Sequence, residues 1–218
     1  MRRTARRPAR SPGVAGVIAL AFWALAVTAA ERTGADLDEI AAIQGNIETL
    51  SARFVQRRSL ELFAEELVSR GGFYFKRPDR FRWDVEEPFR TSMVVAAGKI
   101  VTRDADGTQA HAIPLPVSAT EITGLLTGSI DALRALFDVH VLPAAGGGER
   151  LELRPLQPTL ARIVRTVTLD LAPREKYVRR MLLHEASGDR IEITFDDVRI
   201  NAPLSDALFA LEPDEARR

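Results

Sequence analysis

Short stretches in which apolar and polar residues alternate recur along the chain. In residues 166–171, Val167, Leu169 and Leu171 alternate with two threonines and an aspartate, and residues 190–198 repeat the pattern. Successive side chains of a strand point to opposite faces, so each stretch predicts a strand with one buried face. The pattern predicts a mainly β (α+β) chain built around one antiparallel sheet.

Residues 71–84 predict two strands joined by a tight turn. Bulky side chains occupy positions 73–75, and Phe81 and Trp83 recur with the period of two that a strand shows. Between them, residues 77–79 read Arg-Pro-Asp, in which proline presets φ and aspartate bonds the local backbone. Further strands are predicted at 52–57 and, with helix as the alternative, at 60–67.

Residues 36–50 show a helical rather than a strand period. Their apolar residues recur at intervals of three and four, which places on one stripe Leu37, Ile40, Ile43, Ile47 and Leu50. We expect this helix to cover one opening or face of the sheet.

Residues 113–137 interrupt the strands. Pro114 and Pro116 break the alternation, and two short helices are predicted at 119–126 and 130–137. Their apolar faces contain Ile122, Leu125, Leu126, Ile130, Leu133, Leu136 and Phe137. Because those faces must be buried, we expect the helices to form a lid over the concave face of a curved sheet.

The first thirty residues predict a secretory signal peptide, which leaves one domain over residues 31–218. Five arginines precede an apolar run at 14–27 and three small residues at 28–30. The alternative, a membrane anchor, needs roughly 20 apolar residues. This segment holds five arginines and no acid, so the rest of the chain has 25 basic and 30 acidic residues. That balance argues against a nucleic-acid partner.

The chain contains no cysteine. It therefore cannot be acylated as a lipoprotein is, and it cannot be held together by disulfides. We expect an exported, monomeric protein stabilised by its own apolar core.

Sequence motifs for catalysis are absent. The three histidines, His111, His140 and His184, do not show metal-ligand spacing, and no Gly-x-Ser-x-Gly elbow or phosphate-binding loop occurs. The acid pairs are adjacent in sequence, so on a strand their carboxylates point to opposite faces. We expect no catalytic residues, no metal, no cofactor and no enzymatic activity.

The central hairpin and its surroundings resemble a known family. The resemblance rests on four sequence motifs, which in chain order are Lys76-Arg77-Pro78, Phe81-Arg82-Trp83, Pro88 and Gly98-Lys99. Their order and spacing are similar to those of the periplasmic outer-membrane lipoprotein carrier proteins, LolA. The resemblance extends to Phe54-Val55-Gln56 and, near the end, to Phe195-Asp196-Asp197-Val198, Asn201-Ala202-Pro203-Leu204 and Phe209.

The resemblance implies an incomplete antiparallel β-barrel with an N-terminal helix and a short helical lid over the concave face. It implies a periplasmic chaperone that shelters lipoprotein acyl chains between an inner-membrane ABC-type exporter and an outer-membrane receptor. The alternatives are a related carrier or sensor of another acylated ligand and, further away, a periplasmic hydrolase.

The resemblance also implies a role for Arg77, which corresponds to a family arginine that bonds the lid and keeps the cavity closed; the alternative is an ordinary exposed arginine. Candidates for the cavity wall, with core packing as the competing role, are Phe73, Phe75, Phe81, Trp83, Met93, Ile122, Leu125, Leu126 and Leu133.

Overall fold

A computed structural model describes residues 34–61, 66–96, 99–104, 109–110, 136–144 and 148–210. Its elements, in chain order, are α2 (Gly34–Gly45), β1 (Thr49–Ser59), β2 (Glu66–Lys76), β3 (Arg80–Glu87), β4 (Thr91–Ala96), β5 (Lys99–Asp104), β6 (Gln109–Ala110), β7 (Phe137–Pro143), β8 (Glu149–Pro155), α5 (Pro158–Ala161), β9 (Val164–Leu171), β10 (Val178–Glu185), β11 (Arg190–Ile200) and the 3₁₀ helix η1 (Asp206–Phe209). The predicted signal peptide at 1–30 and the predicted lid helix at 119–126 lie outside these residues, as does the second predicted lid helix, 130–137, except for its last two positions.

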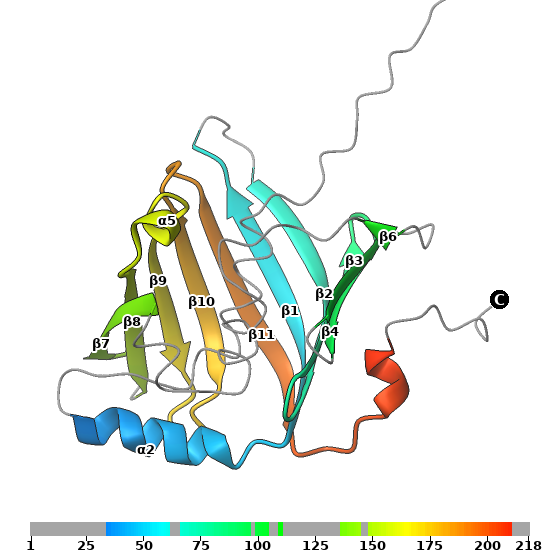
Figure 1. The fold of residues 1–218 in the computed structure, drawn as a ribbon, viewed down its shortest axis with the longest axis horizontal. Helices are drawn as coiled ribbons and strands as arrows, with labels where there is room; N and C mark the ends of the chain where they lie inside the picture. The colour runs from blue at the N-terminus through cyan, green and yellow to red at the C-terminus, as the bar shows by residue number, and fades with distance from the viewer. Residues whose placement is uncertain are drawn as a thin grey trace, which may run out of the picture.

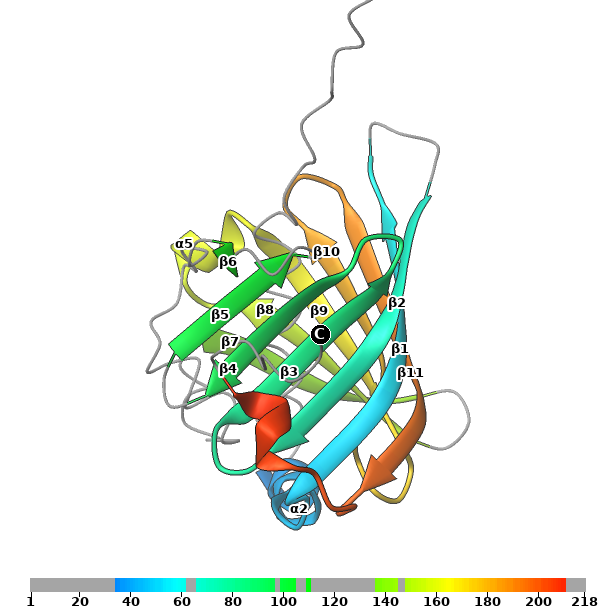
Figure 2. The same cartoon turned by 90° about the vertical axis from the view of Figure 1, so that its right-hand side faces the viewer.

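The described strands form one curved sheet (Figures 1 and 2). Its eleven strands are ordered β6-β5-β4-β3-β2-β1-β11-β10-β9-β8-β7, and every pairing is antiparallel. Register shifts in three of these pairings add local twist and bending to the sheet. Within the described chain β6 and β7 are the two edges and do not pair, so the predicted mainly β, incomplete barrel is confirmed.

Alternation along the strands places the apolar residues on the inner side of the curve. Buried side chains from every strand between β1 and β4 and between β7 and β11 join those of α2 in one apolar cluster. α2 runs across the strand ends on one side of the curved sheet, as Figure 1 shows, and contributes Leu37 and Ile40, both buried. None of the described helices is both long and apolar enough to span a bilayer.

The predicted helix over 36–50 is correct in position but wrong at its end. The helix stops at Gly45, where glycine's backbone freedom disfavours helix, and Asn46 Nδ2 donates to the carbonyl of Ala42 at 3.0 Å. Leu50, which fits the helical stripe by spacing, belongs to β1 and is buried there.

Two other boundaries differ from the sequence prediction. β1 runs to Ser59 and pairs directly with Glu66 at the start of β2, so Leu60 and Glu61 do not belong to a separate strand. Phe137, predicted to end a helix, begins β7 instead. At Phe137 the helical spacing was compatible with the sequence, and strand pairing overrode it.

The outer side of the sheet is polar across β8 to β11. Asp170 accepts from Arg150 Nε at 2.6 Å and from Arg180 Nη1 at 3.4 Å, while Arg180 Nε donates to Glu192 at 2.8 Å. Burial alone would raise the pKa of Asp170, but the hydrogen bonds from Arg150 and Arg180 hold that pKa below its ordinary value. This ladder links four neighbouring strands.

The C-terminal segment packs on the outer side of β3 and β4. Asp206 bonds Lys76 Nζ at 2.5 Å, and Arg82 Nη1 donates to the carbonyl of Leu208 at 3.0 Å. Phe209 is buried, as is Val94, whose neighbours Met93 and Val95 face the other way. The segment from Asn201 to Phe209, which is part of the family resemblance, is thus docked on the outer face.

Candidate functional site

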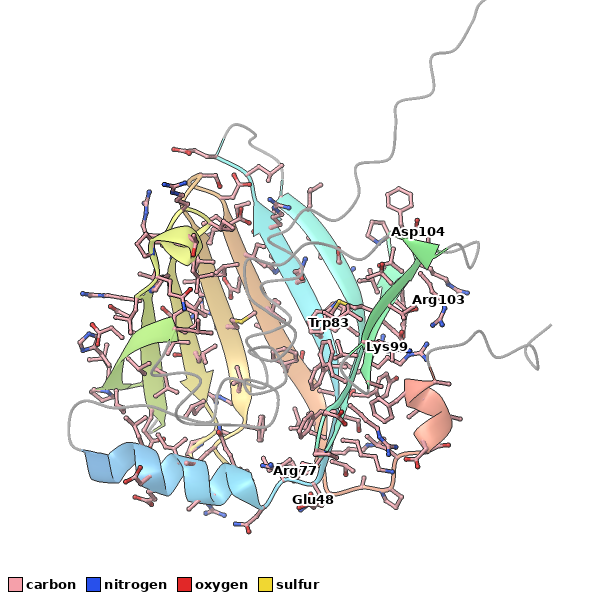
Figure 3. All side chains as sticks on the ribbon, viewed as in Figure 1. Glu48, Arg77, Trp83, Lys99, Arg103 and Asp104 are labelled. Atoms are coloured by element: carbon pink, nitrogen blue, oxygen red, sulfur yellow. The ribbon has the colours of Figure 1, made fainter. Side chains whose placement is uncertain are left out.

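The inner face of β1 to β4 brings together the five predicted cavity residues that the structure describes. Phe73 pairs with Trp83, which pairs with Met93, and on the next row Phe75 pairs with Phe81. All five are buried, and Figure 3 shows Trp83 on the inner side of the curve. The four remaining candidates, Ile122, Leu125, Leu126 and Leu133, lie outside the described residues.

Aromatic rings from four strands form one cluster on this face. Phe54 of β1 stacks on Trp83 of β3 with ring centroids 3.9 Å apart. Phe73 lies between, with its centroid 5.3 Å from Phe81 and 6.1 Å from Phe195 of β11. Such offset and edge-to-face pairs are favourable beyond the apolar area they bury.

Gly71 permits the contact between Phe54 and Trp83, which belong to strands that are not neighbours. It pairs with Phe54 on one side and with Val85 on the other. A β-carbon there would lie 2.9 Å from Phe54 Cε1 and 1.7 Å from the carbonyl oxygen of Asp84. The ring of Phe54 therefore crosses β2 where that strand has no side chain.

Sequence reasoning did not assign Phe54 and Phe195 to the candidate site. Both alternate in phase with the buried residues of their strands, which is the signal that could have found them. Their contact with Trp83 depends on strand order, which the alternation does not contain.

Arg77 lies at the end of α2, next to Glu48 (Figure 3). Its Nε donates to the carbonyl of Ile47 at 2.8 Å, its Nη2 to the carbonyl of Gln44 at 3.2 Å, and its backbone N–H to the carbonyl of Glu48 at 2.9 Å. A guanidinium has several donors in a rigid fork, so it can satisfy carbonyls that a helix end leaves without an intrahelical donor. These bonds tie the turn between β2 and β3 to the helix that crosses the sheet edge.

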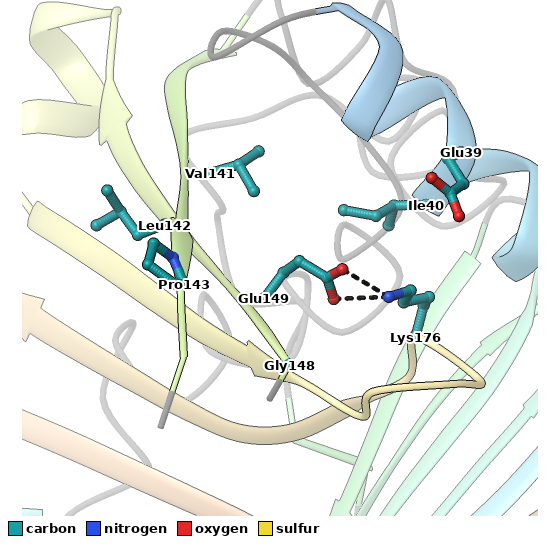
Figure 4. A pocket seen from close by; sticks show the side chains of 8 residues that line it. All are labelled: Glu39, Ile40, Val141, Leu142, Pro143, Gly148, Glu149 and Lys176. Atoms are coloured by element: carbon teal, nitrogen blue, oxygen red, sulfur yellow. Dashed lines mark hydrogen bonds and ion pairs between the residues drawn. The ribbon is translucent and has the colours of Figure 1, made fainter. Parts of the chain in front are cut away.

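A pocket of about 270 Å³ lies between α2 and the hairpin of β7 and β8 (Figure 4). Ile40 and Val141 supply apolar lining, and Lys176 Nζ donates to both carboxylate oxygens of Glu149 at 2.6 and 2.8 Å. Gln44 Nε2 donates to the Lys176 carbonyl, which links this seam to α2. The volume falls below the roughly 300–1,000 Å³ of typical ligand pockets.

The described residues contain no group of three or more histidine, aspartate or glutamate side chains positioned to hold a metal. The apolar inner face can bury apolar groups away from water. The charged groups described above lie instead on the outer face, at the strand ends or in the small pocket.

Comparison with known proteins gives a consistent match along the chain. Residues 45–212 match the model of the family described as outer membrane lipoprotein carrier protein LolA. An outer-membrane lipoprotein carrier protein of Chromohalobacter salexigens is 29% identical over 195 residues, covering 88% of this chain and 89% of that protein. One of Methylococcus capsulatus is 28% identical over 197 residues, covering 90% and 91%.

Among solved structures, an uncharacterized conserved protein from Thermus thermophilus aligns with a TM-score of 0.51. It is 12% identical, and the alignment covers 83% of this chain and 96% of that one. At that identity the likeness concerns the fold alone.

Proposed function

Because this chain belongs to the LolA family of outer membrane lipoprotein carrier proteins, we propose that it carries lipoprotein acyl chains through the periplasm in a hydrophobic cavity on the inner side of its sheet. The observation that supports this most is the buried apolar face formed by an open, curved sheet. An acyl chain of about fifteen methylenes gains roughly 12 kcal/mol on leaving water. A carrier that crosses an aqueous compartment must therefore enclose it.

We place the wall of this cavity at Phe73, Phe75, Phe81, Trp83 and Met93, which share one face and adjoin across strands. The apolar residues predicted in the lid, Ile122, Leu125, Leu126 and Leu133, would face them. Because the rings now pack against one another, they must tilt or separate for an acyl chain to enter.

Arg77 is the proposed latch. In the family resemblance the corresponding arginine bonds the lid, and here its guanidinium already reaches carbonyls at the end of α2. Releasing such bonds would let the cover move, and cargo would shift the population toward the open form by its differential affinity. Transfer then needs no covalent chemistry.

The partners we propose are acylated lipoproteins, an inner-membrane ABC-type exporter that supplies them and an outer-membrane receptor that accepts them. A leader at residues 1–30 would deliver the chain to the periplasm, where it would act as a monomer without cofactor. The names of its relatives as outer-membrane lipoprotein carrier proteins support this setting.

Mass spectrometry of material bound to the protein after purification from the periplasm tests the proposal. We expect acylated lipoproteins or their acylated N-terminal peptides. A different acylated ligand would favour a related carrier or sensor. An empty protein with measurable ester hydrolysis would contradict a carrier and favour a hydrolase.

The Arg77→Leu variant tests the latch separately. We expect it to fold and to bind cargo, but to release cargo to the receptor at a changed rate. Arg80→Leu is the matched control, because Arg80 lies three residues away and pairs with Asp206 on the outer face at 2.5 Å. Release at the wild-type rate from the Arg77 variant would remove this residue from the mechanism and leave the carrier role standing.

A further inference from the structure

The strand ends on the side of the curved sheet opposite α2 expose large apolar side chains. We call this end the rim and define it by Ser59, Glu66 and Leu67 at the paired ends of β1 and β2, residues 88–90 between β3 and β4, and residues 155–165, which contain α5. Strand pairs at this end include Ser59 with Glu66 and Glu185 with Val164. Figure 1 shows α5 at this end and α2 at the other.

Three of the four most exposed large apolar residues in the described chain lie on the rim. Phe89 is 80% exposed at the turn that follows β3, Leu67 is 56% exposed at the start of β2, and Leu156 is 55% exposed before α5. The fourth, Leu142, is 39% exposed near the opposite edge. Single exposed leucines are ordinary, but an almost fully solvated phenylalanine at a turn tip has no packing role that accounts for it.

The rim also carries exposed arginines that form no close ion pair among the described residues. Arg90, Arg162 and Arg165 are exposed, and none of them forms an ion pair with another described residue. Arg162 and Arg165 both follow α5, Arg162 as its C-cap and Arg165 in β9, and Arg90 follows Phe89 directly. The chain beyond residue 30 is acidic overall, with 25 basic and 30 acidic residues, so exposed arginines outside any ion pair at this end differ from the overall charge balance.

Surfaces that bind anionic bilayers combine exposed aromatic and aliphatic side chains with nearby arginines. Aromatic rings are favoured at the headgroup level, and basic side chains are attracted to the negative surface potential. An acidic protein partner would be served by the arginines alone and would leave Phe89 without a function. Phe89 and Arg90 stand together on one short turn, so one approach to a bilayer would engage both.

We propose that the rim docks on the surface of an anionic membrane, with Phe89 entering the headgroup region and Arg90, Arg162 and Arg165 lying against lipid phosphates. This contact does not depend on cargo, so the empty protein should make it. It would orient the molecule with α2 directed away from the bilayer.

The test is sedimentation with vesicles of phosphatidylglycerol mixed with phosphatidylcholine, using protein expressed with its own leader and purified from the periplasm. We expect binding to these vesicles, little binding to pure phosphatidylcholine, and weakening by added salt. The double variant Arg162→Glu, Arg165→Glu should lose at least about 25-fold in partitioning, since each neutralised charge alone accounts for about fivefold. Phe89→Glu should also weaken binding.

Matched controls lie at the α2 edge. Leu142→Glu and Arg174→Glu make the same chemical changes on exposed residues of the opposite edge and should bind as the wild type does. In Phe89→Trp, the new indole emission should shift to shorter wavelength with anionic vesicles, whereas Trp83 is already buried. Equal losses in rim and control variants, no binding by folded wild type, or an unshifted indole would overturn the proposal.

Discussion

Gly71→Ala should lower the free energy of unfolding by about 3 kcal/mol, although it adds only one methyl group. The new β-carbon would lie 1.7 Å from the carbonyl oxygen of Asp84 and 2.9 Å from Phe54 Cε1. The first contact is with backbone, so β2 and β3 would have to move apart. The movement would also disturb the stacking of Phe54 on Trp83, itself worth about 0.5–1.5 kcal/mol.

Gly72→Ala is the matched control. Its β-carbon would meet the hydroxyl of Tyr74 at 2.8 Å, and that ring is the far end of a side chain that can rotate. We expect a loss below about 1 kcal/mol, partly offset by the reduced freedom of the unfolded chain.

Thermal unfolding monitored by circular dichroism and by Trp83 fluorescence measures both variants. A loss of about 3 kcal/mol in a chain of this size lowers Tm by about 6–12 °C. The Trp83 emission of the folded Gly71 variant should also change, because the partner ring above it has moved. Equal Tm values for the two alanine variants would refute the crossing of Phe54 over Gly71 as the reason for that glycine.

Three further predictions concern the charges and the C-terminal segment. The pKa of Asp170 is lowered, so its ion pairs stabilise the fold above the ordinary pKa of aspartate and are lost as pH falls through the folded pKa. Asp170→Asn should lower Tm at neutral pH and make Tm depend less on pH in the acid range. Burial raises the pKa of Glu185, so the protonated carboxyl stabilises the fold at low pH, and this contribution is lost as pH rises through the folded pKa. Glu185→Gln should therefore raise Tm at pH 7 relative to wild type and leave it unchanged at pH 4. Phe209→Ala should cost about 3 kcal/mol in urea unfolding and expose the C-terminal segment to protease, whereas wild-type resistance would show that its docking is dispensable.

The sequence by itself determined most of the strands, the central turn and the apolar face of the sheet. Val167, Leu169 and Leu171 show their common face by spacing alone, and the turn at 77–79 follows from proline and aspartate. These properties are local, because the period of side-chain direction and the φ of proline need only neighbouring residues.

Only the tertiary structure decided which residues meet across the sheet and at its edges. Phe54 reaches Trp83 because β2 lies between their strands and has Gly71 at the crossing point. Arg77 bonds carbonyls thirty and more residues earlier in the chain, and Phe89 stands at the same edge as α5. Strand order and register determine these contacts. Both arise from pairing between distant segments, which no local period of the sequence encodes.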